Sequence, residues 1–372
     1  MQNKKHIVIG MSGGVDSAVA AWLLKKKGHK VTGVFMKNWD DDDTDTYCTS
    51  RQDFLDAAAT ADILNIPLEA VSFSKEYKEK VFNDFLHEYS NGRTPNPDVF
   101  CNSEIKFKAF LNHSFKMGAD LLATGHYAQI KRITDGKYNL LRALDKTKDQ
   151  SYFLHRLTQE QLSFSTFPLG GYLKVDVRKI AKELKLPNAK KPDSTGICFI
   201  GERPFKEFLS KYIKNKPGLI CDSLGNVIGE HDGLHLFTIG QRKGLGIGGI
   251  NTKLKKNLSQ SISDHEPWFV AGKDYKKNRL IVVQGRNNPK LMTKLLTAKN
   301  LHWILNEPPH SGSKLQVKIR YSQNTTVGII NFNKGILKIN FLEPQRAVTP
   351  GQSVVVYEES KCLGGGIICD SN

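Results

Sequence analysis

The N-terminal part of the chain alternates short apolar runs with longer amphipathic ones. Residues 6–11 are apolar and short enough for a buried strand, and residues 31–36 form a second such run. Between them, residues 17–29 have a helical composition that ends near Gly28, a typical helix stop. This strand–helix–strand unit predicts a parallel sheet with right-handed crossovers.

The same alternation continues to about residue 200. Asp176 is a candidate N-cap for a helix whose apolar positions recur every three or four residues up to Leu184. The other expected elements are helices at 52–64 and 75–92 and strands at 68–73 and from Ala119. We therefore expect residues 1–200 to form one doubly wound α/β domain.

The pattern changes after residue 200. Residues 201–272 contain a short helical run at 204–213 and a glycine-rich loop at 240–249, which predicts a small central domain. Residues 273–372 consist of short alternating stretches, with a hairpin turn at 333–335. They predict an all-β C-terminal domain, a barrel or a sandwich.

Composition narrows the range of partners. The 372 residues include 54 Lys and Arg against 37 Asp and Glu, a formal net charge of +17. This excess favours a polyanionic partner such as a nucleic acid, although a Lys-rich surface is the simpler alternative. No run approaches the roughly 18 apolar residues of a membrane span, and the N-terminal run is too short for a signal peptide. We expect a cytoplasmic protein with no membrane contact.

A glycine-rich turn, Ser12-Gly13-Gly14-Val15-Asp16-Ser17, lies between the first strand and the first helix. Backbone N–H groups and the helix dipole favour anions at such a position. The turn has no lysine, so it differs from GxxxxGK[ST], and it does not match GxGxxG. An ordinary tight turn is the alternative. The negative charge of Asp16 would be unfavourable beside phosphates unless Mg²⁺ offset it, which predicts a metal–ATP complex as the ligand.

Two of the six cysteines lie in loops beside basic residues. Cys101 follows two prolines and precedes Lys106, near an expected helix start with Asn102 or Ser103 as the cap, a setting that lowers a thiol pKa. Cys198 lies in a glycine-containing loop after two lysines. Structural roles are expected for Cys48, Cys221, Cys362 and Cys369. There is no CxxC pair, so no resident metal site is predicted, and the Asp40–Asp43 run is interpreted as a solvated loop.

Together these motifs resemble the bacterial tRNA-specific 2-thiouridylases, members of the ATP-pyrophosphatase superfamily. The resemblance covers residues 10 to about 368 and rests on GMSGGVDSAVAA, NPDVFCN, TGHYA, KDQSYFL, DSTGICFIG, TIGQRKGLGIGG, PWFV and CLGGGII. It implies an adenine nucleotide alpha hydrolase-like domain over 1–200, a small central domain over 201–272 and a tRNA-binding β-barrel over 273–372. It also implies ATP-dependent conversion of the wobble uridine, at anticodon position 34, to 2-thiouridine.

The resemblance assigns roles by position. ATP would be bound by Gly10, Met11, Ser12, Gly13, Gly14, Val15, Asp16 and Ser17, with Met36 and Gly125 bordering the adenosine. The target base would contact Asn96, Pro97, Asp98 and His126, and the rest of the tRNA would contact Lys148, Asp149, Gln150, Arg320, Tyr321 and Gln352. Cys198 would carry a persulfide, Cys101 would be its partner nucleophile, and Asp98 would belong to the catalytic set. Ser322 departs from the pattern, since a basic residue is expected there.

The chemistry of the residues agrees with this interpretation. The C2 carbonyl of uridine is a poor electrophile, so its oxygen needs adenylation before sulfur can attack, and a second thiol is needed to release the sulfur from its carrier. A sulfur-relay protein or a cysteine desulfurase would supply the persulfide, and the chain is expected to be a monomer. Two alternatives remain: another ATP-pyrophosphatase, such as argininosuccinate synthetase or lysidine synthetase, and a basic RNA-binding protein without enzymatic activity.

Overall fold

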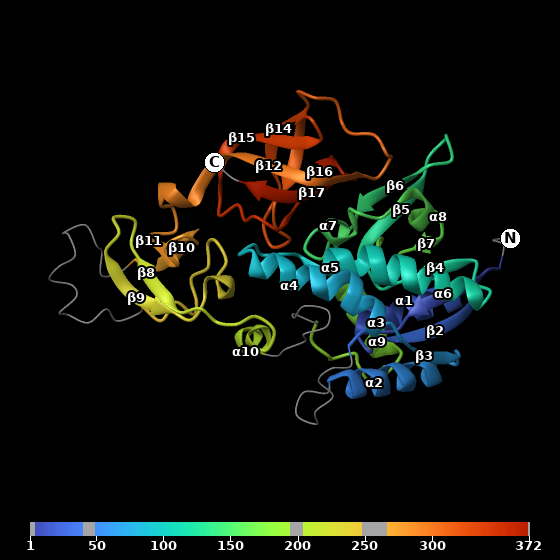
Figure 1. Cartoon of the computed structure of the whole chain (residues 1–372). Helices are drawn as coiled ribbons and strands as arrows, with labels where there is room; N and C mark the ends of the chain where they lie inside the picture. The colour runs from blue at the N-terminus through green and yellow to red at the C-terminus, as the bar shows by residue number, and fades with distance from the viewer. Residues whose placement is uncertain (1–3, 40–48, 194–203, 248–265, 371–372) are drawn as a thin grey trace.

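A computed structural model describes residues 4–39, 49–193, 204–247 and 266–370 (Figure 1). The first domain is built on a parallel five-stranded sheet in the order β3-β2-β1-β4-β7. Its strands are β1 (His6–Gly10), β2 (Lys30–Lys37), β3 (Leu68–Ser72), β4 (Leu121–Ala123) and β7 (Ser165–Thr166). This arrangement confirms the predicted doubly wound α/β domain.

Helices cover both faces of this sheet, which explains why its central strand is apolar throughout. Successive side chains of a strand point to opposite faces. Ile7 and Ile9 accordingly pack with α1 (Val15–Lys26), α2 (Thr49–Leu64) and α9 (Lys174–Glu183). Val8 packs in the other core, which also contains residues from a helical stretch made of α3 (Ser74–Tyr77), a π-helical turn (Lys78–Phe82) and α4 (Asn83–Ser90), and from α6 (Phe110–Lys116).

One helix boundary differs from the prediction. Leu173, not Asp176, is the N-cap of α9, and Asp176 lies in the first turn of the helix. A carboxylate in the first turn still interacts favourably with the helix dipole. Asp176 therefore does mark the start of this helix, but three residues after the N-cap. The predicted helix was right in kind and began too late.

The central domain has its own four-stranded sheet, ordered β10-β11-β8-β9. The strands are β8 (Gly218–Cys221), β9 (Val227–His231), β10 (Trp268–Asp274) and β11 (Arg279–Gln284), and α10 (Phe205–Ser210) precedes them. Because β11 pairs with both β10 and β8, this sheet continues past residue 272, where the sequence pattern placed the start of the barrel.

Six C-terminal strands close into a barrel, because β12 pairs with both β15 and β17. They are β12 (Met292–Trp303), β13 (Lys314–Lys318), β14 (Thr326–Asn333), β15 (Ile336–Arg346), β16 (Ser353–Glu358) and β17 (Lys361–Asp370). The all-β prediction is confirmed as a barrel, and the hairpin turn at 333–335 lies between β14 and β15. Across the described segments, no helix combines the length and apolarity that a bilayer span requires.

A hairpin of the first domain extends the barrel sheet. β5 (Ala128–Arg132) and β6 (Tyr138–Arg142) pair with each other, and Leu140 and Leu141 of β6 pair with Cys362 and Lys361 of β17. The Arg142 guanidinium stacks 3.9 Å from the Tyr357 ring and donates to Gln316 Oε1 at 3.0 Å. The first domain and the barrel are therefore joined by a continuous sheet.

This junction generates a stability prediction. Leu140→Ala removes a fully buried side chain from the paired strand and should lower the free energy of unfolding by about 2–5 kcal/mol. Leu342→Ala, on the exposed side of β15, is the matched control and should change it by less than about 0.5 kcal/mol. Denaturant unfolding of the two variants measures both values. Equal effects would contradict the burial of this junction.

Candidate functional site

The glycine-rich turn forms a closed loop between β1 and α1. The Ser17 hydroxyl accepts from Ser12 N–H at 3.2 Å and donates to Gly14 C=O at 3.1 Å. Gly14 is the N-cap of α1 and has no side chain with which to cap it. Gly13 has a φ of +72°, and a Cβ there would lie 2.3 Å from the Asp53 carbonyl oxygen. The loop therefore presents helix N–H groups beside backbone that only glycine can form.

Met36 and Gly125 meet this loop at the carboxyl end of the sheet. The Met36 Cε atom would lie 3.3 Å from a Cβ on Gly10. Gly125 follows β4, and a Cβ on it would lie 2.8 Å from Ser17 N. Ligands of open α/β sheets bind at this edge. The structure thus brings together all ten residues that were expected to surround ATP, while their contacts with ATP stay a prediction.

Asp16 is held by residues that lie far from it in the sequence. Lys174 Nζ donates to both Asp16 carboxylate oxygens at 2.7 Å, and the Tyr127 hydroxyl donates to Oδ1 at 2.8 Å. Burial and the Asp16 carboxylate raise the pKa of Tyr127, so it stays a donor at neutral pH. A carboxylate at the first turn of α1 is therefore neutralised by a lysine of α9.

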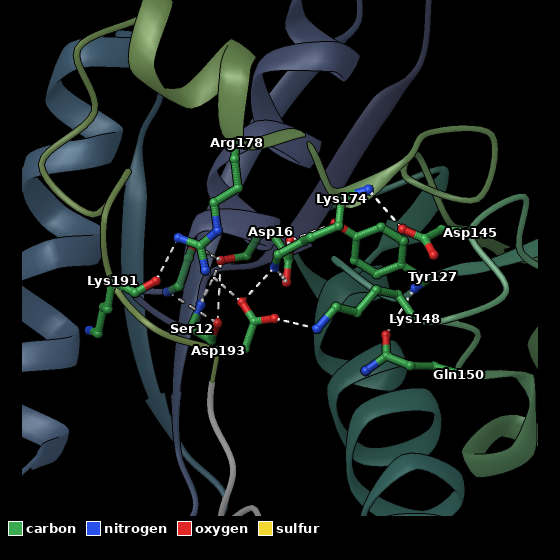
Figure 2. Close-up of polar contacts among 12 residues, drawn as sticks. Ser12, Asp16, Tyr127, Asp145, Lys148, Gln150, Lys174, Arg178, Lys191 and Asp193 are labelled. Carbon is green, nitrogen blue, oxygen red and sulfur yellow. Dashed lines mark hydrogen bonds and ion pairs between the residues drawn. The ribbon is translucent and has the colours of Figure 1, made fainter. Parts of the chain in front are cut away.

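The same lysine belongs to a larger ionic cluster around Asp193 (Figure 2). Asp193 accepts from Lys148 at 2.7 Å, from Lys174 at 2.7 Å and from Arg178 at 2.8 Å. Burial alone would raise the pKa of Asp193, but the hydrogen bonds from Lys148 and Lys174 outweigh it and lower the pKa to about 2. No local pattern predicts that Lys174, Arg178 and Asp193 join the site, because only the folded sheet brings them there.

Lys191 fixes the other side of the loop. Its ammonium pairs with Asp53 and Asp56 of α2 at 2.6 Å each and lies 3.4 Å from Gly13 C=O. Asn188 Nδ2 donates to the same carbonyl at 3.0 Å. These contacts bind the segment that follows α9 to the glycine-rich turn. In the sequence, Lys191 is only one of the two lysines before Cys198.

Cys101 is fully buried and lies inside a helical stretch. α5 (Pro97–Phe100) begins with Asn96 as its N-cap, and a π-helical segment (Cys101–Ala109) continues it. The expectation that Asn102 or Ser103 caps a helix here is wrong, because proline at the first helical position starts the helix earlier. Asn102 instead donates to Phe153 C=O at 3.1 Å.

Several residues expected to contact tRNA meet where the three domains join. Gln352, beside the barrel, donates to the carbonyls of Thr94 and Pro95 at 2.8 and 3.1 Å, directly before Asn96. Arg320 donates to Ile239 C=O of the central domain at 2.7 Å and to Ala347 C=O at 3.0 Å. These side chains hold the domains together around the loop at 94–98. Their contact with tRNA stays a prediction.

Aromatic contacts connect this junction to the 148–150 segment. The Tyr321 ring lies 4.5 Å from that of Phe153 on α7 (Ser151–Leu154), between ring centroids. Asp149 is buried and accepts from Ala143 N–H at 3.2 Å and from the Ser151 hydroxyl at 3.0 Å. Gln150 Oε1 accepts from Tyr127 N–H at 2.9 Å. Residues 148–150 therefore lie between the ionic cluster of Asp16 and Asp193 and the junction of the three domains.

His126 lies between Gly125, which is close to Ser17, and Tyr127, which donates to Asp16. Its Nδ1 lies 2.8 Å from the Thr124 hydroxyl, and its ring packs near Phe107 and Phe167. Burial and then the charge of Lys106 lower its pKa well below the usual value, so the imidazole is neutral at pH 7. It can therefore hydrogen-bond to a base without carrying charge.

Some expected residues lie outside the described residues: Cys198, Cys48 and the Asp40–Asp43 run. Within the described segments, no group of three or more His, Cys, Asp or Glu residues is arranged to hold a metal ion. The described part of the site is thus a glycine-rich loop at a helix N-terminus, an ionic cluster and a buried cysteine beside a three-domain junction.

Comparison with known families defines the class of this protein. A model described as the tRNA methyl transferase HUP domain matches residues 5–202, the corresponding PRC-barrel domain matches 206–284, and an aminomethyltransferase beta-barrel domain matches 293–368. The chain is thus a HUP-domain protein with a PRC-barrel domain and a C-terminal β-barrel.

Relatives over the full length narrow the class to one family. A protein of Nitrosomonas europaea named tRNA-specific 2-thiouridylase MnmA is 58% identical over 100% of this chain and 99% of its own length. A protein of the same name from Cupriavidus metallidurans is 54% identical over 98% and 99% of the two chains. The chain belongs to the tRNA-specific 2-thiouridylase family, which confirms the resemblance found in the sequence. A U34-tRNA thiolase from Methanococcus maripaludis is 20% identical, with a TM-score of 0.36, over 56% of this chain and 65% of its own.

The contact between Gly125 and the loop gives a test of the ATP site. Gly125→Ala places a methyl group 2.8 Å from Ser17 N and should weaken ATP binding about tenfold or more by displacing the start of α1. Gly171→Ala is the control, since nothing lies within 4 Å of its Cβ position. Titration calorimetry with ATP measures both affinities. Unchanged affinity in Gly125→Ala would place the nucleotide elsewhere.

Proposed function

We propose that this chain is an ATP-dependent tRNA-uridine 2-sulfurtransferase that converts the wobble uridine at position 34 to 2-thiouridine. Membership of the 2-thiouridylase family over the full length carries this proposal. The proposal is also supported by the contacts that link the ionic cluster of Asp16 and Asp193, residues 148–150 and residues 94–98. They connect the glycine-rich loop to a three-domain junction near a buried cysteine.

In the first step the loop from Gly10 to Ser17 binds ATP, and the C2 oxygen of uridine attacks the α-phosphorus. Pyrophosphate leaves and an adenylated base remains. Backbone N–H groups at the start of α1 stabilise the negative charge of the phosphates. Mg²⁺ would enter with ATP and offset phosphate charge, and Asp16, the carboxylate of this loop, would hold it. Asn96, Pro97 and Asp98, with neutral His126, would hold the extruded base.

In the second step sulfur replaces the activated oxygen. The terminal sulfur of a Cys198 persulfide attacks C2 and AMP leaves with the original oxygen. The Cys101 thiolate then attacks the Cys198 sulfur, which forms a Cys101–Cys198 disulfide and leaves the sulfur on the base as 2-thiouridine. A small thiol must reduce this disulfide before the next turnover. Since Cys101 is fully buried, the helical segment that carries it has to open toward Cys198.

The partners follow from this chemistry. A sulfur-relay protein or a cysteine desulfurase would form the Cys198 persulfide, and the chain would act as a monomer in the cytoplasm, where tRNA and ATP meet. The net charge of +17 supports binding to the tRNA backbone. Incubation of the protein with unmodified tRNA, Mg-ATP and a labelled persulfide donor tests the whole proposal, with 2-thiouridine in the nucleoside digest as the readout.

Asp16→Ala should lower tRNA-dependent pyrophosphate release by about 100-fold or more. It removes the carboxylate that holds Lys174 and Tyr127 against the loop, and small displacements of reacting groups cost this much. tRNA binding should stay near the wild-type level. Asp62→Ala, an exposed carboxylate on α2, is the control. Wild-type pyrophosphate release by Asp16→Ala would exclude this loop as the ATP site.

The two cysteines should separate sulfur transfer from adenylation. Cys198→Ser and Cys101→Ser should form no 2-thiouridine, because one lacks the persulfide carrier and the other cannot release the sulfur. Both should still release pyrophosphate with tRNA. Cys369→Ser, half-buried on β17, is the control and should keep wild-type thiolation. Full thiolation by Cys198→Ser would exclude the persulfide mechanism.

A further inference from the structure

Asp193 occupies an unusual position for a carboxylate, because three cationic side chains converge on it. Lys148, Lys174 and Arg178 all donate to it within 2.8 Å, and Lys174 bridges it to Asp16 of the glycine-rich loop (Figure 2). The cations come from two separate segments, the loop before α7 and helix α9. Two carboxylate oxygens thus lie where three positive groups meet at the edge of an anion-binding loop.

This cluster is accessible enough to exchange its anion. The side chains of Asp193, Lys148 and Arg178 keep 32%, 37% and 27% of their exposure. The partly exposed ion pairs of Asp193 with Lys148 and Arg178 contribute little to stability, so breaking them costs little. The Lys174 side chain is only 12% exposed, but it keeps Asp16 as its partner when Asp193 leaves. Lysine and arginine also recognise phosphoryl oxygens, lysine as a point charge and arginine with the planar fork that it also presents to carboxylates.

Asp193 is also tethered beside these cations. Arg178 donates to Lys191 C=O at 2.7 Å and to Ala189 C=O at 3.0 Å, and Lys191 itself pairs with Asp53 and Asp56. Residues 189–191 are therefore fixed to α9 and α2, and Asp193 follows two residues later. A tethered group competes at a high effective concentration against a free ligand.

We propose that Asp193 is an internal substitute for the pyrophosphate portion of ATP. When ATP or pyrophosphate binds the glycine-rich loop, its β- and γ-phosphoryl oxygens take the hydrogen bonds of Lys148, Lys174 and Arg178, and the Asp193 carboxylate is displaced. When pyrophosphate leaves, Asp193 returns and prevents it from rebinding. The exchange is non-covalent, and it rests on the proposed use of ATP.

Titration of the full-length protein with inorganic pyrophosphate and Mg²⁺, without tRNA, tests this exchange. Asp193→Asn keeps the size of the side chain and removes the competing charge, so pyrophosphate should bind about tenfold tighter or more, the effect of one charge-assisted hydrogen bond. Asp176→Asn makes the same change in net charge at an exposed site on α9 and should leave the affinity within about twofold of wild type.

A second variant tests the cations directly and does not depend on how Asp193→Asn folds. Lys148→Gln should weaken pyrophosphate binding about tenfold, while Lys179→Gln, an exposed lysine of α9, should not. Equal pyrophosphate affinity in Asp193→Asn and Asp176→Asn, weaker binding in Asp193→Asn, or wild-type binding in Lys148→Gln would overturn the proposal. Failure of the wild type to bind ATP would instead overturn the proposed function itself.

Discussion

The arrangement of the site depends on one shared lysine. Lys174 Nζ contacts both Asp16 and Asp193 at 2.7 Å while its side chain is only 12% exposed. A charged group taken out of water needs opposite charge close by, so the ammonium holds both carboxylates in place. Asp16 belongs to the glycine-rich loop and Asp193 to the segment that leads toward Cys198. The ion pairs of this one ammonium therefore connect the glycine-rich loop with that segment.

The second constraint is how three domains surround the loop at 94–98. The pairing of β6 with β17 attaches the barrel to the first domain. Gln352 and Arg320 also donate hydrogen bonds to backbone carbonyls of the first domain, the central domain and the barrel. Residues expected to contact tRNA thus also fix the geometry of the junction. A side chain held by the fold is pre-organised, so it loses little conformational freedom when a ligand binds.

The charged residues of the site lie apart from Cys101. Ions gather at the carboxyl edge of the sheet, whereas Cys101 lies in the apolar core formed with Tyr77, Phe82 and Phe110. A thiol without solvent contact is protected from oxidation until the segment that carries it moves. Neutral His126, packed against Phe107, lies at the boundary between the two environments.

The sequence by itself determined the elements and the loop. The apolar runs of β1 and β2, the turn between β14 and β15 and the glycine-rich turn are local features, because strand burial, turn formation and helix N-termini depend on neighbouring residues. It placed the N-cap of α9 three residues late and the N-cap of the helix near Cys101 six or seven residues late, where a proline at the first helical position starts the helix earlier. Only the tertiary structure decided that Lys174 joins Asp193 to Asp16, and that β5 and β6 extend the barrel. Ion pairing and strand pairing between segments more than 100 residues apart depend on distances in space, which no local pattern contains.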